Sequence, residues 1–396
     1  MTPDKGMARV LACLMGLFAW MAWGQAAADS KRQDVYWAGF AFTGEASSRE
    51  DAVPYMDAAV TGRGAEALNM QMLAAVHRRP PSHIAVIDGA GLAQLDGTTS
   101  ATVLAAAIDR ETVSIEPIGG QYKILVELAL QALLFDFREQ QVIASYPMTL
   151  QYTDLMSHQP SHADLRSIVE DLVYGSADNQ LASILAKTLS DVRLPDAAVR
   201  RIQVGGVALS DTARQKLPNG ASESLLKATL SHELSKIISS NAGIGLLPPS
   251  VGEAIGGTMA ARFSDGRVFQ LTIPEADYVI RVHIDDWRRG VLKQTPAMRQ
   301  ELFGAFFNIE VLEPHSGTVY FNQPLRKGAT KIIPATQEEV DAWSASYETL
   351  LAGFDAFAKA ASAQPGHRDW LGEQKPGGRS LQQHTKALQE LIQSCR

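Results

Sequence analysis

The sequence predicts an α+β protein built as two tandem modules, each a mixed β-sheet with helices packed on it. Residues 38–43 (AGFAFT) and 205–210 (GGVALS) follow one pattern: small, glycine, apolar, alanine, apolar, hydroxyl. A helical pattern and a short apolar strand follow each segment, and β-prone runs separated by short turns come next. The order β-α-β-β-β-β-α is therefore predicted twice.

The strands and helices of the first half follow from hydrophobic spacing. Aromatic and β-branched residues predict a strand at 35–43, and apolar residues at helical intervals predict a helix at 64–78. The remaining predicted elements are strands at 83–87, 122–128, 132–137 and 142–146, and a helix at 161–189 that breaks near Tyr174 and Gly175.

The second half repeats this order. Its predicted elements are a strand at 202–210, a helix at 222–239, strands at 244–247, 278–284, 305–311 and 318–321, and a helix at 336–361. Thr336 and Glu339 have the spacing of a capping box at the start of the last helix. The strand-helix-strand start of each half implies one parallel crossover, and the short turns that follow imply antiparallel pairing.

Four segments are expected along the chain. They are a signal peptide at 1–28, a first module at 29–195, a second module at 196–362 and a polar C-terminal tail at 363–396. The tail is rich in Gly, Gln and charged residues, which predicts a loose segment that ends in an amphipathic helix at 380–393. Cys395 has no second cysteine to pair with once the signal peptide is removed.

The N-terminus has the three parts of a secretory signal. Lys5 and Arg9 are positive, Val10–Trp23 is an uncharged apolar run, and small residues end at Ala28, after which cleavage is expected. A membrane anchor is the alternative, but the run is shorter than the about 20 residues that cross a bilayer. The mature chain has no later apolar segment of that length, so it is expected in the periplasm or outside the cell.

Composition narrows the class of partner. The chain has 396 residues, of which 46% are hydrophobic and 20% charged, a balance typical of globular proteins. Its formal net charge of −7 gives no basic excess for nucleic acid. An envelope protein or a surface polymer is the expected partner, and peripheral association with the outer membrane is left open.

Metal motifs are incomplete. Residues 231–236 (SHELSK) begin like the zinc motif HExxH, but Lys236 stands where the second histidine would be. His158 and His162 are four residues apart but have no obvious third ligand. The sequence therefore assigns no metal ligand.

Catalytic motifs are incomplete as well. Ser224 and Lys227 match the S-x-x-K nucleophile pattern, yet a serine at a helix start is better explained by capping. The hydrolase elbow G-x-S-x-G is absent, and no glycine-rich segment follows a strand and opens a helix as a phosphate loop does. No catalytic residue and no cofactor site is assigned, which favours a non-enzymatic protein.

Residues 277–289 (DYVIRVHIDDWRR) concentrate charge within one predicted strand. Alternation places a core stripe on one face, formed by Tyr278, Ile280, Val282 and Ile284. The other face carries the predicted partner-binding residues Arg281, His283, Asp285 and Trp287. Asp285 and Asp286 point to opposite faces if the strand is regular, so they do not share a metal or a proton. The segment 122–128 is taken as the equivalent in the first half, with Lys123, Leu125 and Glu127 in place of Val279, Arg281 and His283.

The order of elements in each half resembles the periplasmic α/β modules of the curli-secretion lipoprotein CsgG, the N-terminal domain of TolB and LpoB-like envelope lipoproteins. The matching phrases are GFAF (39–42) and GVAL (206–209) for the first strand, and EADYVI (275–280) for the long strand. The first half departs from the pattern with GGQY at 119–122, and neither half has the lipid-anchor cysteine. The resemblance implies a mostly non-enzymatic role in assembly or partner binding in the cell envelope.

The sequence thus favours an exported, non-catalytic envelope protein that binds a protein or polymer partner in assembly, secretion or maintenance of the envelope. A periplasmic receptor whose two lobes close on a small molecule is the first alternative, although the antiparallel run in each half fits it poorly. A hydrolase with a site assembled from distant residues is the second alternative.

Overall fold

The computed structural model describes residues 32–43, 52–88, 100–118, 120–195, 199–249, 257–263, 266–335, 341–367, 370–374 and 378–396. The expected signal peptide at 1–28 lies outside these residues, as do Thr336 and Glu339 of the expected capping box. Within the described part of the chain, no helix is long and apolar enough to cross a membrane.

The elements follow the predicted order in part, because the strand expected at 244–247 forms only isolated bridges at Leu246 and Leu247. Those of the first half are β1 (Gln33–Thr43), α3 (Pro54–Arg63), α4 (Ala65–Arg78), β2 (Ile84–Ile87), β3 (Thr102–Ile118), β4 (Gln121–Asp136), β5 (Gln141–Met156), α5 (His162–Tyr174) and α6 (Leu181–Leu189). Those of the second half are β6 (Ile202–Leu209), α7 (Asp211–Arg214), α8 (Glu223–Ala242), β7 (Thr258–Phe263), β8 (Val268–Thr272), β9 (Tyr278–Gln294), β10 (Met298–Glu313), β11 (Thr318–Pro334), α9 (Ala342–Ala361), α10 (Trp370–Glu373) and α11 (Gly378–Ser394).

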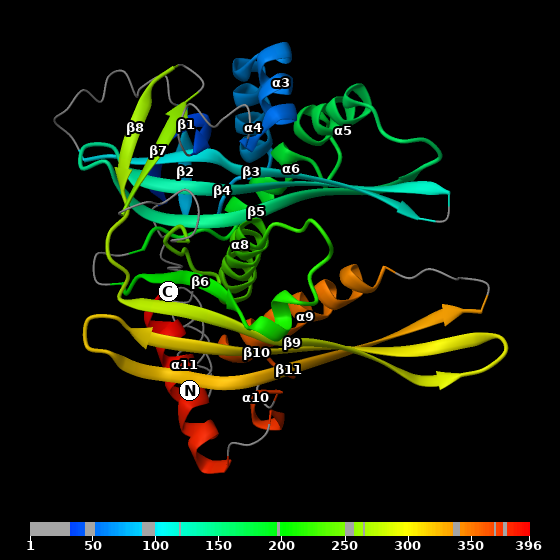
Figure 1. Ribbon diagram of the computed structural model, residues 1–396. Helices are drawn as coiled ribbons and strands as arrows, with labels where there is room; N and C mark the ends of the chain where they lie inside the picture. Colours follow the sequence, from blue (N-terminus) through cyan, green and yellow to red (C-terminus); the bar gives the residue numbers. More distant parts are fainter. Residues whose placement is uncertain are drawn as a thin grey trace, which may run out of the picture.

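The strands form two mixed sheets, which confirms the α+β fold class (Figure 1). Sheet A has seven strands in the order β2-β1-β3-β4-β5-β8-β7, and β7 also pairs with β1. Sheet B has four strands in the order β11-β10-β9-β6. In each sheet the first strand of its half runs parallel to the long strand beside it, and the next two long strands are antiparallel.

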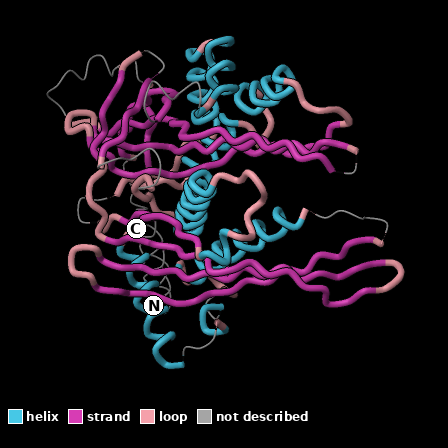
Figure 2. The backbone as a smooth tube through the Cα atoms, in the orientation of Figure 1, coloured by secondary structure: helices cyan, strands magenta, loops and turns pink. Residues whose placement is uncertain are grey.

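Helices and sheets alternate through the molecule. One face of sheet A shares a hydrophobic core with α3, α4, α5 and α6. A second core joins sheet B to α8, α9 and α11. Helix α8 lies between the two sheets (Figures 1 and 2), where His232 and Glu233 of the helix bond to Met148 and Thr149 of β5. The layers are therefore helices, sheet A, helices and sheet B.

The six-residue repeat at 38–43 and 205–210 corresponds to the same β-bulge in both halves. The pairing of β1 with β3 shifts register between Trp37 and Gly39, and the pairing of β6 with β9 shifts between Val204 and Gly206. Both glycines have a positive φ, 92° at Gly39 and 129° at Gly206. A side chain is strained in that conformation, so the bulge explains why the pattern contains glycine.

We expect Gly39→Ala to lower the free energy of unfolding by about 2–3 kcal/mol. Besides the strain of the positive φ, a Cβ at Gly39 would lie 2.7 Å from Asn69 Nδ2, and Asn69 Oδ1 accepts the Phe40 N–H at 2.7 Å. Gly64→Ala is the matched control, because its φ is 91° and no atom lies within 4 Å of the added Cβ. Urea denaturation measures both; equal losses would show that the Asn69 contact contributes nothing.

The largest difference from the sequence prediction is strand β3. The segments 122–128 and 132–137, expected as two strands, are one strand, β4, and β3 at 102–118 takes the place equivalent to β9. The start of β3 contains three consecutive alanines, Ala105, Ala106 and Ala107, and alanine is depleted in strands. Ala105 and Ala107 are buried there against the hairpin β7–β8, which is also absent from the prediction.

The C-terminal segment is packed rather than loose. The expected amphipathic helix is present as α11, but its side chains Leu388, Leu391 and Ile392, with Cys395 after it, belong to the core of sheet B. Helix α9 begins later than predicted, because Asp341 caps it by accepting the N–H of Ser344 at 2.8 Å. Burial of apolar surface on sheet B outweighs the polar composition of the segment.

Candidate functional site

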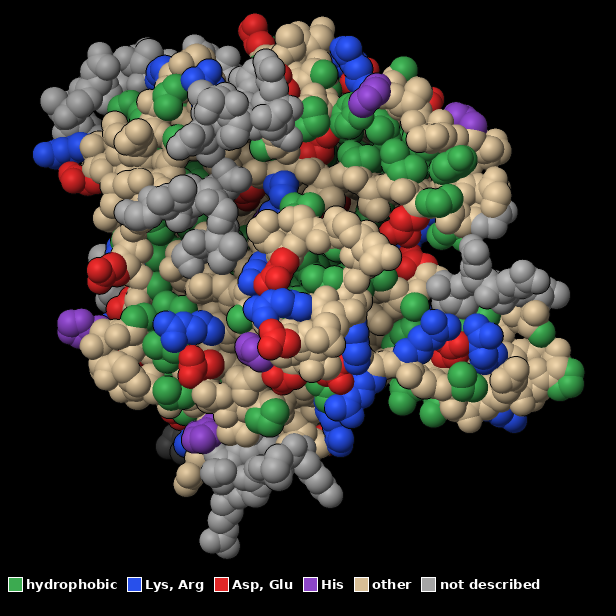
Figure 3. All heavy atoms as spheres, in the orientation of Figure 1, with side chains coloured by type: hydrophobic (Ala, Val, Ile, Leu, Met, Phe, Trp, Pro, Cys, Tyr) green, Lys and Arg blue, Asp and Glu red, His purple; other side chains and the backbone are tan. Residues whose placement is uncertain are grey.

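Strand β9 places Arg281 and His283 on a face of sheet B that no described helix or strand covers. Their side chains are 59% and 47% exposed. Arg281 Nη1 lies 3.5 Å from Glu310 Oε2, and His283 Nδ1 donates to Asp285 Oδ1 at 2.8 Å. In Figure 3, positive, negative and histidine side chains are mixed over the half of the molecule that holds this sheet. We call this surface the open face of sheet B.

The expectation that Trp287 shares the open face is wrong. A β-bulge leaves Asp285 without a partner on β10, because Phe307 pairs with Ile284 and Phe306 with Asp286. The extra residue reverses the alternation, so Trp287 turns into the core, where it is 4% exposed and its ring lies 5.3 Å from that of Trp343. Asp286 is bound by Lys216 and Arg288.

Sheet A has the same bulge at Asp109, and this corrects the expected equivalence between the halves. Ile108 pairs with Leu130 and Arg110 with Ala129, so Asp109 is skipped as Asp285 is. The hydroxyls that end the six-residue repeat bond to these bulges: Thr43 Oγ1 donates to Asp109 Oδ1, and Ser210 Oγ donates to the backbone oxygen of Asp285. Segment 102–118, not 122–128, is therefore the counterpart of β9.

The two copies use their equivalent faces differently. Ala105 and Ala107 occupy the positions of Arg281 and His283, and both alanines are fully buried. They lie under hairpin β7–β8, and α8 packs farther along the same face of sheet A. The face that sheet A buries within the chain is thus exposed to solvent in sheet B.

A layer of buried polar side chains joins α8 to sheet A. We call it the polar layer; it consists of Asp109, Glu127, Gln131, Ser145, Thr149, His232, Glu233 and Lys236. Asp109 Oδ1 accepts hydrogen bonds from Thr43 Oγ1 at 2.6 Å and Gln131 Nε2 at 2.7 Å. His232 Nε2 donates to the Met148 oxygen at 3.1 Å, and its Nδ1 lies 3.9 Å from Asp109 Oδ2.

The rest of the polar layer is an ion pair with a bridging hydroxyl. Glu233 Oε1 accepts from Thr149 Oγ1 at 2.8 Å and from Lys236 Nζ at 2.6 Å. His232 and Glu233 are both buried, with exposed fractions of 4% and 5%. Sequence reasoning missed this layer because its partners come from both halves of the chain.

Burial shifts the acidity of the polar layer. It raises the pKa of Asp109 to about 6 and, together with the nearby Glu233, the pKa of Glu127 to about 7. It lowers the pKa of His232 to about 4, so this imidazole is neutral at pH 7. Among the described residues, no three His, Cys, Asp or Glu side chains are arranged to hold a metal. The polar layer is a buried contact between α8 and sheet A.

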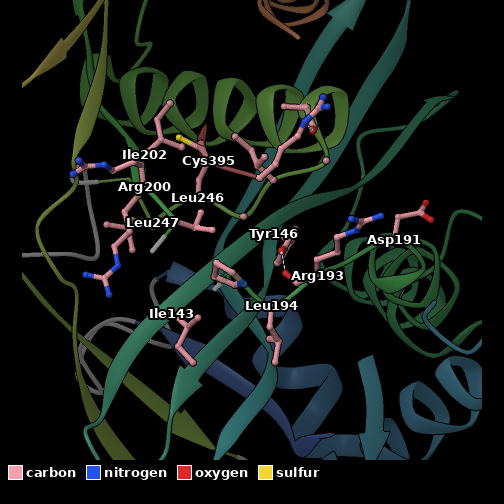
Figure 4. Close-up of a pocket in the computed structure, with 18 of the residues that line it drawn as sticks. Ile143, Tyr146, Asp191, Arg193, Leu194, Arg200, Ile202, Leu246, Leu247 and Cys395 are labelled. Carbon is pink, nitrogen blue, oxygen red and sulfur yellow. Dashed lines mark hydrogen bonds between the residues drawn. The ribbon is translucent and has the colours of Figure 1, made fainter. Parts of the chain in front are cut away.

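A cavity of about 550 Å³ lies at the junction of the two halves (Figure 4). Its walls come from β5, the segment after α6, the start of β6 and the segment after α8, with Ile143, Leu194 and Leu246 among them. Arg200 at this site is paired with Asp277 at 2.9 Å. Cys395 is 5% exposed, and burial raises the pKa of its thiol to about 12, so it stays protonated and unreactive.

Comparison with known proteins yields no family model and no curated protein that matches the chain. Among solved structures, a hypothetical protein from Chlamydia trachomatis is 11% identical, covering 50% of this chain and 95% of its own, with a TM-score of 0.21. A minor lipoprotein from Acinetobacter baumannii is 13% identical over 46% of this chain and 97% of its own, with a TM-score of 0.20. A protein from Xanthomonas campestris is 10% identical over 42% and 87%, with a TM-score of 0.20.

Proposed function

We propose that the chain is an exported, non-catalytic envelope protein that binds a protein or polymer partner through the open face of sheet B. The observation that carries the proposal is the contrast between the two copies of one sheet face. In sheet A this face is buried beneath other elements of the chain, whereas in sheet B it carries Arg281 and His283 into solvent. In the first half, the repeated unit packs through this face against other elements of the chain. In the second half, the equivalent face is free to bind another molecule.

The chemistry of the open face favours a polar partner. It combines Arg281, His283, Asp285 and Glu310, whose opposite charges can pair with complementary charges on another surface. The same proposal includes two modules, at 29–195 and 196–362. It also includes export of the chain with cleavage after Ala28. Kinship with the CsgG, TolB or LpoB-like modules would place that partner in envelope assembly, secretion or maintenance.

Joint replacement of His283 and Asp285 by alanine is expected to reduce capture of the partner at least tenfold, because it removes two adjacent polar groups from the open face. The measurement is crosslinking and affinity capture with the mature protein in periplasmic extract. Arg138→Ala with Glu139→Ala is the control, since this exposed ion pair lies at the turn between β4 and β5, away from sheet B. Unchanged capture by the folded His283/Asp285 variant would remove the open face from the proposal.

A further inference from the structure

A groove of about 950 Å³ lies between hairpin β3–β4 of sheet A and the N-terminal ends of α8 and α9. Its walls include the β3 residues 112–118, Leu125 of β4, Leu226 of α8 and Trp343 of α9. Lys123 of β4 pairs with Asp341, the N-cap residue of α9, at the border of the groove. The groove is thus bounded on one side by the hairpin β3–β4, in which β3 is the outer strand beyond Ile108, and on the other side by residues of α8 and α9 that include Leu226 and Trp343.

The edge of β3 that borders the groove is unpaired among the described residues. Strand β1 pairs with β3 only as far as Ile108, and β4 occupies the opposite edge. In an antiparallel pair, about half of the backbone N–H and C=O groups of β3 point away from β4. Residues 112–116 therefore present an edge roughly 17 Å long, at about 3.3 Å per residue, with the hydrogen-bonding pattern of a strand, and Pro117 ends it because it has no N–H.

The edges of sheet B carry more residues that block strand addition than this edge does. Strand β11 carries Pro324, Arg326, Lys327, Lys331 and Pro334, and the unpaired end of β9 carries Arg288, Arg289 and Lys293. Lysine, arginine and proline are the residues that block edge pairing in natural sheets. Residues 112–116 (TVSIE) contain no lysine, arginine or proline and include the β-branched Thr112, Val113 and Ile115, whereas Pro117 blocks strand pairing beyond them.

We propose that this groove binds an extended polypeptide segment of a partner protein, which adds to β3 as a further strand. The segment would carry apolar side chains at alternate positions, because one of its faces meets Leu125, Leu226 and Trp343. It would also carry a lysine or arginine, because Glu116 and Glu127 line the groove and its one lysine is already paired with Asp341.

Two polar side chains, Tyr347 and Glu127, lie at the inner end of the groove. The hydroxyl of Tyr347 is buried and has no hydrogen-bond partner among the described residues, and Glu127 beside it is 8% exposed. A basic side chain that reaches this end can donate to Glu127, and a backbone carbonyl can accept from Tyr347. This site lies on sheet A, so its occupancy does not depend on the open face of sheet B.

The probe is a fluorescent peptide of seven residues, Thr-Val-Lys-Val-Thr-Val-Lys, titrated with the mature protein and followed by anisotropy. We expect saturable binding that weakens at least tenfold when alternate backbone nitrogens of the peptide are methylated. Replacing both lysines by glutamate is expected to weaken it by a similar factor. Equal binding of the methylated peptide, or no saturable binding of the parent peptide, overturns the proposal.

A protein variant locates the binding. Ser114→Lys adds a protective charge to the β3 edge and is expected to weaken peptide binding at least tenfold, whereas Thr330→Lys on exposed β11 leaves it unchanged. Circular dichroism checks that both variants fold. A photo-crosslinker in place of Ile115, which is 36% exposed, is expected to label the peptide. Equal loss in both variants, or crosslinks only to this chain's own residues, overturns the assignment to β3.

Discussion

Replacing Phe307 by alanine is expected to lower the free energy of unfolding by about 3–5 kcal/mol. Phe307 is fully buried on β10, and its ring packs edge-to-face on Phe354 of α9 with 5.5 Å between ring centroids. Gly353 lets α9 approach this closely, since a Cβ there would lie 2.8 Å from the Phe307 ring. The substitution leaves a cavity between sheet B and its helix layer that the packed helix cannot fill.

Phe306 is the matched control, because it is the next residue on the same strand and faces the other way. Its ring lies under the guanidinium of Arg288 at 4.6 Å and is only partly buried. We expect Phe306→Ala to cost about 1 kcal/mol, the scale of one cation–π contact plus partial burial. Urea unfolding followed by circular dichroism measures both variants. Similar losses would contradict the assignment of one core face and one open face to sheet B.

The regular parts of the fold could be predicted from the sequence because local patterns determine them. The core stripe of Tyr278, Ile280, Val282 and Ile284 is buried as its alternation predicts. The six-residue repeat predicts equivalent first strands, and the structure adds that both contain a bulge just before the glycine at the second position of the repeat, Gly39 and Gly206. Each of these features depends on residues that are neighbours in the chain.

The candidate site was predictable only in part. Alternation places Arg281 and His283 correctly, but it fails at Trp287 because a one-residue bulge reverses every side chain beyond Asp285. A signal was present: Ile-Asp follows the repeat at 108–109 in the first half and at 284–285 in the second, although it also occurs at 87–88. The polar layer has no such local signal, since α8 and β5 meet only in the folded chain.

Asp109→Asn is expected to stabilise the protein relative to the wild type as the pH rises. The pKa of Asp109 is raised by burial to about 6, above the ordinary value of about 3.9 that applies in the unfolded chain. Between these values the unfolded chain releases a proton that the native state keeps, so the wild type loses stability as the pH rises from about 4 to 6. An amide stays neutral and can still accept the hydrogen bonds of Thr43 and Gln131.

The expected size of this pH effect follows from the pKa of Asp109, which is roughly two higher in the native state than in the unfolded chain. Each pKa unit corresponds to about 1.4 kcal/mol. The difference in unfolding free energy between variant and wild type should grow by about 3 kcal/mol from pH 4 to pH 7 and then stay constant. Urea denaturation at each pH measures it. A difference that does not change with pH would show that Asp109 is ionised in the native state throughout this range.

The contribution of His232 to the unfolding free energy changes with pH in the opposite direction, so His232 provides a second test of the polar layer. Its pKa is lowered by burial to about 4, so on acidification below about 6.5 the unfolded chain takes up a proton that the native state refuses, and stability falls as pH falls. In the wild type, this loss of stability on acidification opposes the losses that Asp109 and Glu127 cause as the pH rises. All three effects fall between about pH 4 and pH 7. His232→Gln is therefore expected to make stability fall more steeply with rising pH, and Asp109→Asn to make it nearly flat. Equal slopes in the two variants would mean that these groups do not titrate across the buried contact between α8 and sheet A.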